Sequence, residues 1–189
     1  MISLKAFAPI LADLLALTPA AIYERQRALI RAGVLPAPVG RGRGNGLPAT
    51  AETAALMLIA IMVTDNLSDT DGRVQKLAEA KVDVRTRRQG CRLTKAPTFK
   101  AALTAILASE ELAAAVWAIS VSRTDLHGTI HFYWGRNRTS GRTRFGQEAP
   151  FPNDLETRAR LRGGVVQAIS KALKATDPAI GNRPQFVTA

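Results

Sequence analysis

The sequence predicts an α+β fold, in which N-terminal helices precede a small antiparallel sheet packed with further helices. Two patterns predict it. Apolar residues recur with a helical period through the N-terminal third, and the runs 116–122 and 128–134 alternate with a period of two. The chain has 189 residues, of which 47% are hydrophobic, and this content is typical of a folded protein rather than a disordered tail.

The N-terminal third is predicted to begin with two helices joined by a short turn. The first covers residues 7–17, and Thr18 followed by Pro19 is a typical N-cap and first residue of the second. The second helix has a core side with Ile22 and Leu29. The other side is cationic, because Tyr23, Arg27 and Arg31 follow one another at intervals of four residues.

A hairpin and a third helix are expected next. Gly33 stands where a helix C-cap glycine belongs, and the prolines after it prevent the helix from continuing. Val34-Leu35 and Leu47 are predicted to be the two short strands of the hairpin, with its tip at 40–46. Thr50 is expected to cap a helix over 51–67 that is apolar nearly all round and therefore buried. Together these elements predict a winged helix-turn-helix.

The rest of the chain is predicted to alternate helices with a small sheet. Residues 73–100 form the most basic stretch, with helical character over 74–84 and an irregular connection over 85–96. Helices are expected at 99–107 and 110–115, then a hairpin of the two alternating runs, a third strand at 142–145 and a helix over 155–173. The predicted division is a winged-helix domain at 1–70, a basic connection at 71–98, an α+β domain at 99–176 and a loosely held tail at 177–189.

The region 8–67 resembles the DNA-binding domain of MerR-like winged-helix proteins. The corresponding pieces are Tyr23-Glu24-Arg25, the run from Arg31 to Pro36 and the helix opened by Thr50. The resemblance covers about a third of the chain and implies double-stranded DNA as the partner. It does not reach the long dimerisation helix or the effector domain of that family, so it does not imply effector sensing.

The predicted DNA-binding residues lie on the second helix, at the hairpin tip and in the basic stretch. The second helix is expected to enter a major groove and to point side chains at base edges, with Arg31 nearer a phosphate. The tip is expected to follow the backbone or to enter a narrow minor groove. The predicted residues are Thr18, Ala20, Tyr23, Glu24, Arg27, Arg31, Arg41, Arg43, Arg85, Arg87 and Arg88.

Charge supports this interpretation, whereas the sequence offers little support for a metal site or a nucleotide site. The net charge is +11 and the pI about 10.8, so the field of the chain attracts polyanions. No metal or cofactor is expected. His127 and His131 are about 13 Å apart on a strand, too far to share an ion. The glycine-rich tip matches neither a P-loop nor a dinucleotide fingerprint.

Aromatic residues near the end of the second alternating run allow two interpretations. Phe132 and Trp134 share a face with Ile130, which favours packing into the core. The alternative is that Phe132, Tyr133 and Trp134 stack on nucleic acid beside neighbouring arginines.

The function predicted from these residues is sequence-selective binding of double-stranded DNA by a small transcriptional regulator of a bacterium, phage or mobile element. We expect a homodimer, no enzymatic activity and no membrane, with RNA polymerase or another DNA-binding protein as a possible partner. A lone cysteine, no export signal and no apolar span favour the cytoplasm. The alternatives are an architectural or assembly protein, such as an excisionase or a small terminase-like subunit, and a nucleic-acid-processing enzyme.

Overall fold

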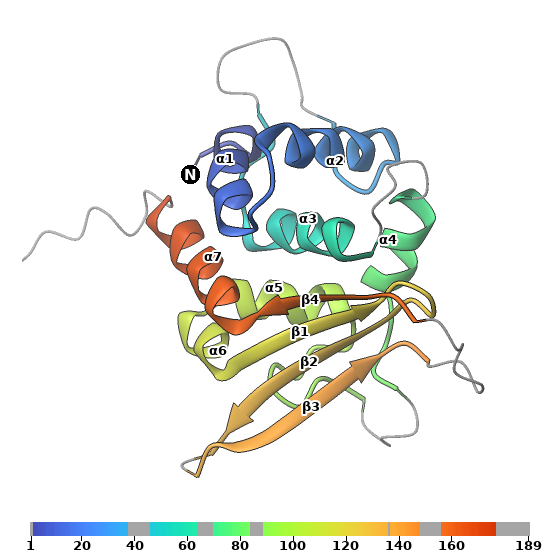
Figure 1. Ribbon diagram of the computed structural model, residues 1–189, viewed down its shortest axis with the longest axis vertical. Coiled ribbons are helices and arrows are strands. Elements are labelled where there is room, and N and C mark those ends of the chain that lie inside the picture. Colours follow the sequence, from blue (N-terminus) through green and yellow to red (C-terminus); the bar gives the residue numbers. More distant parts are fainter. Residues whose placement is uncertain are drawn as a thin grey trace, which may run out of the picture.

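A computed structural model describes residues 2–37, 46–63, 70–83, 89–135, 137–147 and 156–176. It confirms the α+β class, because the chain forms helices and one antiparallel sheet in separate segments (Figure 1). The elements of the described residues are α1 Leu4–Leu14, α2 Pro19–Arg31, α3 Ala51–Val63, α4 Thr70–Ala78, α5 Phe99–Ala108, α6 Glu110–Ala115, β1 Val116–Ser122, β2 His127–Trp134, β3 Thr139–Phe145, β4 Arg158–Arg162 and α7 Gly163–Ala175.

The two helices expected at the start of the chain, joined by a short turn, are α1 and α2. The Thr18 side chain accepts a hydrogen bond from the Ala21 amide at 3.2 Å, and Pro19 follows it as the first helical residue. Gly33 ends α2 with a φ of +69°, a conformation that favours glycine. The two caps therefore confine α2 to the length that the sequence predicts.

The short strands expected to flank the hairpin tip are not formed, and this prediction is wrong. The amides of Val34 and Leu35 both donate to the Leu29 carbonyl, so they close the end of α2. Leu47 instead accepts a hydrogen bond from the Leu4 amide at 2.6 Å, and Pro48 pairs with Ser3. The backbone groups of these flanking residues thus have partners outside any hairpin.

Helix α3 is buried between the N-terminal helices and the rest of the molecule, as its apolar sequence predicts. Figure 1 shows it beneath α1 and α2 and above the sheet, and one core cluster runs from α1 to α7. Thr50 caps its start with a 3.1 Å hydrogen bond from the Thr53 amide. At its other end the carbonyl of Met62 accepts from Arg123 at 3.0 Å, and that of Val63 from Arg73 at 3.4 Å. Arginines from neighbouring elements therefore satisfy its last carbonyls.

The sheet has the strand order β3-β2-β1-β4, with antiparallel neighbours. The predicted hairpin of β1 and β2 and the third strand are confirmed. The helix expected over 155–173 is wrong in its first half, because Arg158–Arg162 is β4 and α7 begins at Gly163. Ala159 and Leu161 alternate with arginines there, which is a strand pattern at the edge of the sheet.

The helices cover only one face of the sheet. On that face Phe99 of α5 packs against Phe145, with ring centroids 5.4 Å apart, and a Cβ on Gly128 would lie 2.7 Å from the Phe99 ring. Ile119, Ile130 and Phe132 are also buried there. In Figure 1 no helix crosses the opposite face, which we call the open face. Among the described residues, no helix has the length and apolar character needed to cross a membrane.

Candidate functional site

Helix α2 presents one continuous face to solvent. Its inner side is held by Ile22 and Leu29, which are 1% and 0% exposed. The outer side follows the helical period, so its members lie together on one side of α2, a helix at the top of the molecule in Figure 1. These exposed residues are Thr18, Pro19, Ala20, Tyr23, Arg27 and Arg31.

The middle of this face has its own charge network. Arg27 contacts Glu24 at 3.2 Å, one helical turn apart, and the two side chains are 58% and 44% exposed. The Tyr23 ring has two cations near it, Lys5 of α1 at 5.7 Å and Arg27 at 5.9 Å from its centroid. An exposed pair of this kind contributes little to stability, so Arg27 can exchange Glu24 for another anion at small cost.

The structure brings together six of the predicted DNA-binding residues on α2 and its N-cap. Glu24 is half-buried at the edge of the exposed face, beside Arg27. The other five predicted residues, Arg41, Arg43, Arg85, Arg87 and Arg88, lie outside the described residues.

A second cluster of cations lies on the open face of the sheet, along both edges. The strand register puts Arg162, Ala118, His131 and Arg142 in one row across the four strands. The next row runs from Arg160 of β4 through Ser120 and Thr129 to Arg144 of β3. Because strands are about 4.8 Å apart, the two edges of the face are separated by about 14 Å.

The centre of the open face is aromatic. A β-bulge between Val116 and Ala118 turns Trp117 onto this face, where its ring lies 4.7 Å from His131 and 6.3 Å from Tyr133. Two arginines reach over these rings. Arg160 lies 5.4 Å from the Trp117 centroid, and Arg138, which follows β2, lies 4.9 Å from that of Tyr133.

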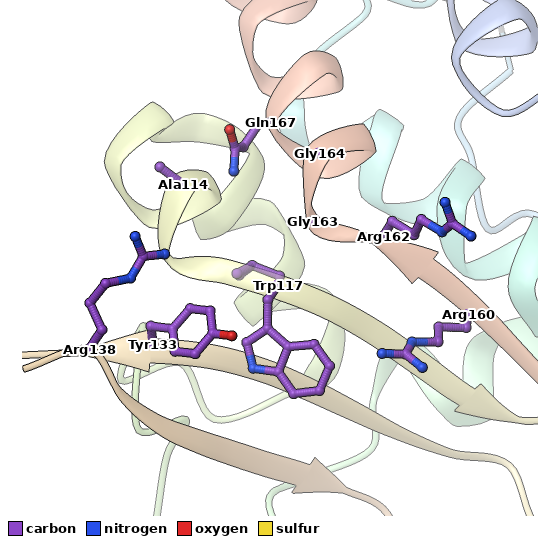
Figure 2. A pocket seen from close by; sticks show the side chains of 10 residues that line it. Ala114, Trp117, Tyr133, Arg138, Arg160, Arg162, Gly163, Gly164 and Gln167 are labelled. Carbon is purple, nitrogen blue, oxygen red and sulfur yellow. The ribbon is translucent and has the colours of Figure 1, made fainter.

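A hollow of about 760 Å³ opens beside this cluster. Figure 2 shows Trp117 and Tyr133 at its floor, Arg160 and Arg138 on either side, and Gln167 above them. The first turn of α7 forms part of its wall and has no side-chain cap, so its amides add a partial positive charge. None of the described residues that line it carries a carboxylate.

The arginines of the open face differ in how they are neutralised. Arg158 pairs with Glu156 at 2.7 Å, and this hydrogen bond holds the pKa of the Glu156 carboxyl below its usual value. Four arginines of the open face have no carboxylate of a described residue within 4.0 Å. They are Arg138, Arg142, Arg160 and Arg162.

The surroundings of His131 disfavour its charged form. Partial burial lowers its pKa from 6.5, and the positive charges of Arg160, Arg142 and Arg158 lower it further. The ring nitrogen Nε2 lies 3.2 Å from the Ser120 hydroxyl. His127 is buried at the start of β2. Among the described residues no cluster of side chains is suited to hold a metal ion.

Sequence reasoning missed Trp117, Arg160 and Arg162 as members of a surface. Trp117 was assigned only to an alternating strand, and the bulge that turns it outward depends on tertiary pairing. The arginines of β4 were assigned to a helix. Their period of two, with Ala159 and Leu161 between them, was the signal available. Trp134 is 44% exposed and stacks with Arg92 at 3.6 Å, so it caps the edge of the core instead of filling it.

Comparisons with protein-family models, with curated proteins and with solved structures found no match to this chain. Its function is therefore inferred from its own residues and geometry.

Proposed function

We propose that this protein binds double-stranded DNA with sequence selectivity, using α2 as a recognition helix in the major groove. The exposed face of α2 carries this proposal. Tyr23, Arg27 and Arg31 project in line from a helix whose other side is fixed to the core by Ile22 and Leu29. A rigid helix with donors on one exposed side is what base-edge recognition requires.

The positions along α2 suit different parts of DNA. Ala20 is small and Tyr23 planar near the N-terminal end, the part of a recognition helix that contacts base edges. Arg27 is one turn further, where a guanidinium can donate to guanine while Glu24 accepts from cytosine. Arg31 is nearer the C-terminal end and suits a phosphate. The net charge of +11 supports the sequence-independent share of affinity.

The proposal extends to a MerR-like arrangement of the helices, a transcriptional regulator as the biological role and a homodimer. One recognition helix reads only a few base pairs, and two copies related by a twofold axis read two half-sites about one helical turn apart. The turn from α1 to α2 is short, and its tight conformation includes Ala16 with a φ of 52°. A short, fixed turn holds the recognition helix at one angle.

The first experiment selects bound sequences from a pool of random duplexes. Selective recognition predicts enrichment of one motif, and footprinting on that motif should protect a single site. The absence of any enriched motif, together with cooperative filling or bending of DNA, would support the architectural or assembly alternative instead.

The residue that tests the recognition helix is Arg27. We expect R27A to weaken binding to the preferred site about 5- to 150-fold, equivalent to about 1–3 kcal/mol, because a base contact is lost. Binding to random duplex should change much less. Fluorescence anisotropy with both duplexes measures the difference.

Lys171 offers the matched control, since it is an exposed cation on α7, away from α2. K171A removes the same charge and should leave the preference for the selected site unchanged. Equal losses for R27A on selected and random duplexes would reject a base-reading role for this face.

A further inference from the structure

We infer that the open face of the sheet is a second binding surface, for single-stranded DNA. It lies on β1–β4, away from the exposed side of α2 (Figure 1). Its chemistry also differs from that of α2, because aromatic rings stand at its centre and arginines along its edges. The choice of DNA over RNA rests on the proposed function, whereas the single-stranded form follows from the surface itself.

The aromatic centre selects bases that are not paired. Trp117, His131 and Tyr133 are partly exposed, and the Trp117 ring centroid lies 4.7 Å from that of His131 and 6.3 Å from that of Tyr133. Flat rings in this position stack on the faces of bases, and a duplex keeps those faces inside its own stack. The hollow of about 760 Å³ beside Trp117 gives an unstacked base a place to enter.

The arginines match the spacing of a nucleic-acid backbone. Arg160 and Arg162 are two residues apart on β4, which places their Cα atoms about 6.7 Å apart along the edge. Arg142 of β3 and Arg138 lie on the other side of the aromatic centre. Because these four have no carboxylate partners among the described residues, a chain of phosphates completes their charge balance.

The closeness of the arginines to the rings fits the same role. Arg160 lies 5.4 Å from the Trp117 ring centroid and Arg138 lies 4.9 Å from that of Tyr133, so each guanidinium can donate to a phosphate oxygen next to a base that stacks on the ring. An acidic peptide would use the charges but leave the aromatic centre without a partner. The combination therefore favours a ligand that has anions and flat rings in alternation.

The test uses the full chain and a fluorescently labelled twelve-nucleotide strand of thymidines, with binding followed by anisotropy. We expect W117A to weaken binding about 5- to 150-fold because one base loses its stacking platform. Trp134 supplies the matched control, since it is also an exposed tryptophan stacked by an arginine but stands on the helix-covered side of the sheet. W134A should alter the affinity by less than about 2-fold on the same scale.

A second variant keeps the inference testable if W117A fails to fold. R160Q changes an exposed side chain and should reduce the slope of log affinity against log salt by about 0.7, the value for one phosphate contact on a single strand. Equal losses for W117A and W134A, or an unchanged slope for R160Q, would overturn the assignment of this face. Tighter binding of the matching uridine strand would overturn the choice of DNA.

Binding at the open face and binding by the recognition helix are tested independently. R27A should leave thymidine-strand binding unchanged, and W117A should leave binding to the selected duplex unchanged. Selective duplex binding by the wild type, with no binding of the thymidine strand, would reject the single-strand inference while the proposal for α2 stands.

Discussion

At the scale of single residues, three arginines of the open face lower the pKa of His131. The imidazole is partly buried and faces Arg160 and Arg158 from β4 and Arg142 from β3, while Ser120 and Trp117 contact it from β1. All of the charged neighbours are positive. Protonating His131 would therefore add a further cation to a group that already repels it.

The first prediction concerns the pKa of His131. Burial is the largest cause of the lowered pKa and the charge of Arg160 is the second, so R160Q should move the pKa back toward 6.5. R162Q should move it much less, because Arg162 is not among the charges that shift it. Proton NMR titration of the imidazole resonances measures both variants, with H131Q identifying the resonance. A larger shift in R162Q than in R160Q would contradict this account.

The same lowered pKa makes stability depend on pH. The unfolded chain binds a proton below about pH 6.5 more readily than the folded protein does, so this part of the free energy of unfolding is complete above that pH. It is lost as the pH falls from 6.5 toward the folded pKa, with a slope of at most about 1.4 kcal/mol per pH unit. Denaturant unfolding of wild type and H131Q across this window measures the difference.

Some positions of single residues could be predicted from the sequence and others could not. The caps at Thr18 and Gly33 and the inner residues of α2 were predictable, because they depend on local hydrogen bonds and one helical period. The place of Trp117 was not, since the bulge that turns it outward arises from pairing with β2. The DNA-contacting roles of Tyr23, Arg27 and their neighbours stay predictions.

At the scale of elements, the junction between β4 and α7 shows why one strand was predicted as a helix. Residues 155–173 contain apolar residues at helical spacing, and no proline marks a boundary. Yet Arg158–Arg162 pairs with β1, and the chain turns into α7 at Gly163. The pairing partner is about forty residues away in sequence, so a local pattern could not reveal it.

Gly163 makes this junction possible and gives the next prediction. A Cβ there would lie 2.2 Å from the Val116 carbonyl oxygen, a backbone atom that cannot move away without disturbing β1. We expect G163A to lower the free energy of unfolding by about 1–3 kcal/mol, the usual cost of a forced shift in a packed region. Chemical denaturation followed by circular dichroism measures it.

Gly164 is the matched control, one residue further along the same helix. A Cβ there would meet nothing within 4 Å, so G164A should be neutral or slightly stabilising, since alanine favours a helix over glycine. If both variants lose the same stability, the close approach to β1 is not the reason for glycine at 163.

At the scale of the whole molecule, helices that are far apart in sequence share one core. The α+β class and most of the helices were predictable from periodicity, whereas the way the layers join was not. Lys100 of α5 pairs with Glu52 at the start of α3, with 2.9 Å between Nζ and Oε1. At the other end of α3, Arg123 and Arg73 donate to the last carbonyls of that helix. The division near residue 70 stays a prediction. A fragment that ends there would leave the sheet-facing side of α3 uncovered.

The position of α3 has a consequence for the time scale on which its amide protons exchange with solvent. Its buried residues contact elements on both sides, so its backbone hydrogen bonds can open only when those layers separate. We expect deuterium uptake in α3 to be among the slowest in the chain and to match that of β1. Much faster uptake in α3 than in β1 would show that the N-terminal helices open by themselves.

Matched protection would make α3 a common reporter for ligands bound at distant places. Any ligand that binds the folded chain lowers the population of the opened state, by an amount set by its concentration and affinity. A duplex on α2 and a single strand on the sheet would each slow the same protons in α3, although neither touches them. Exchange at this one buried helix would then measure occupancy of both surfaces.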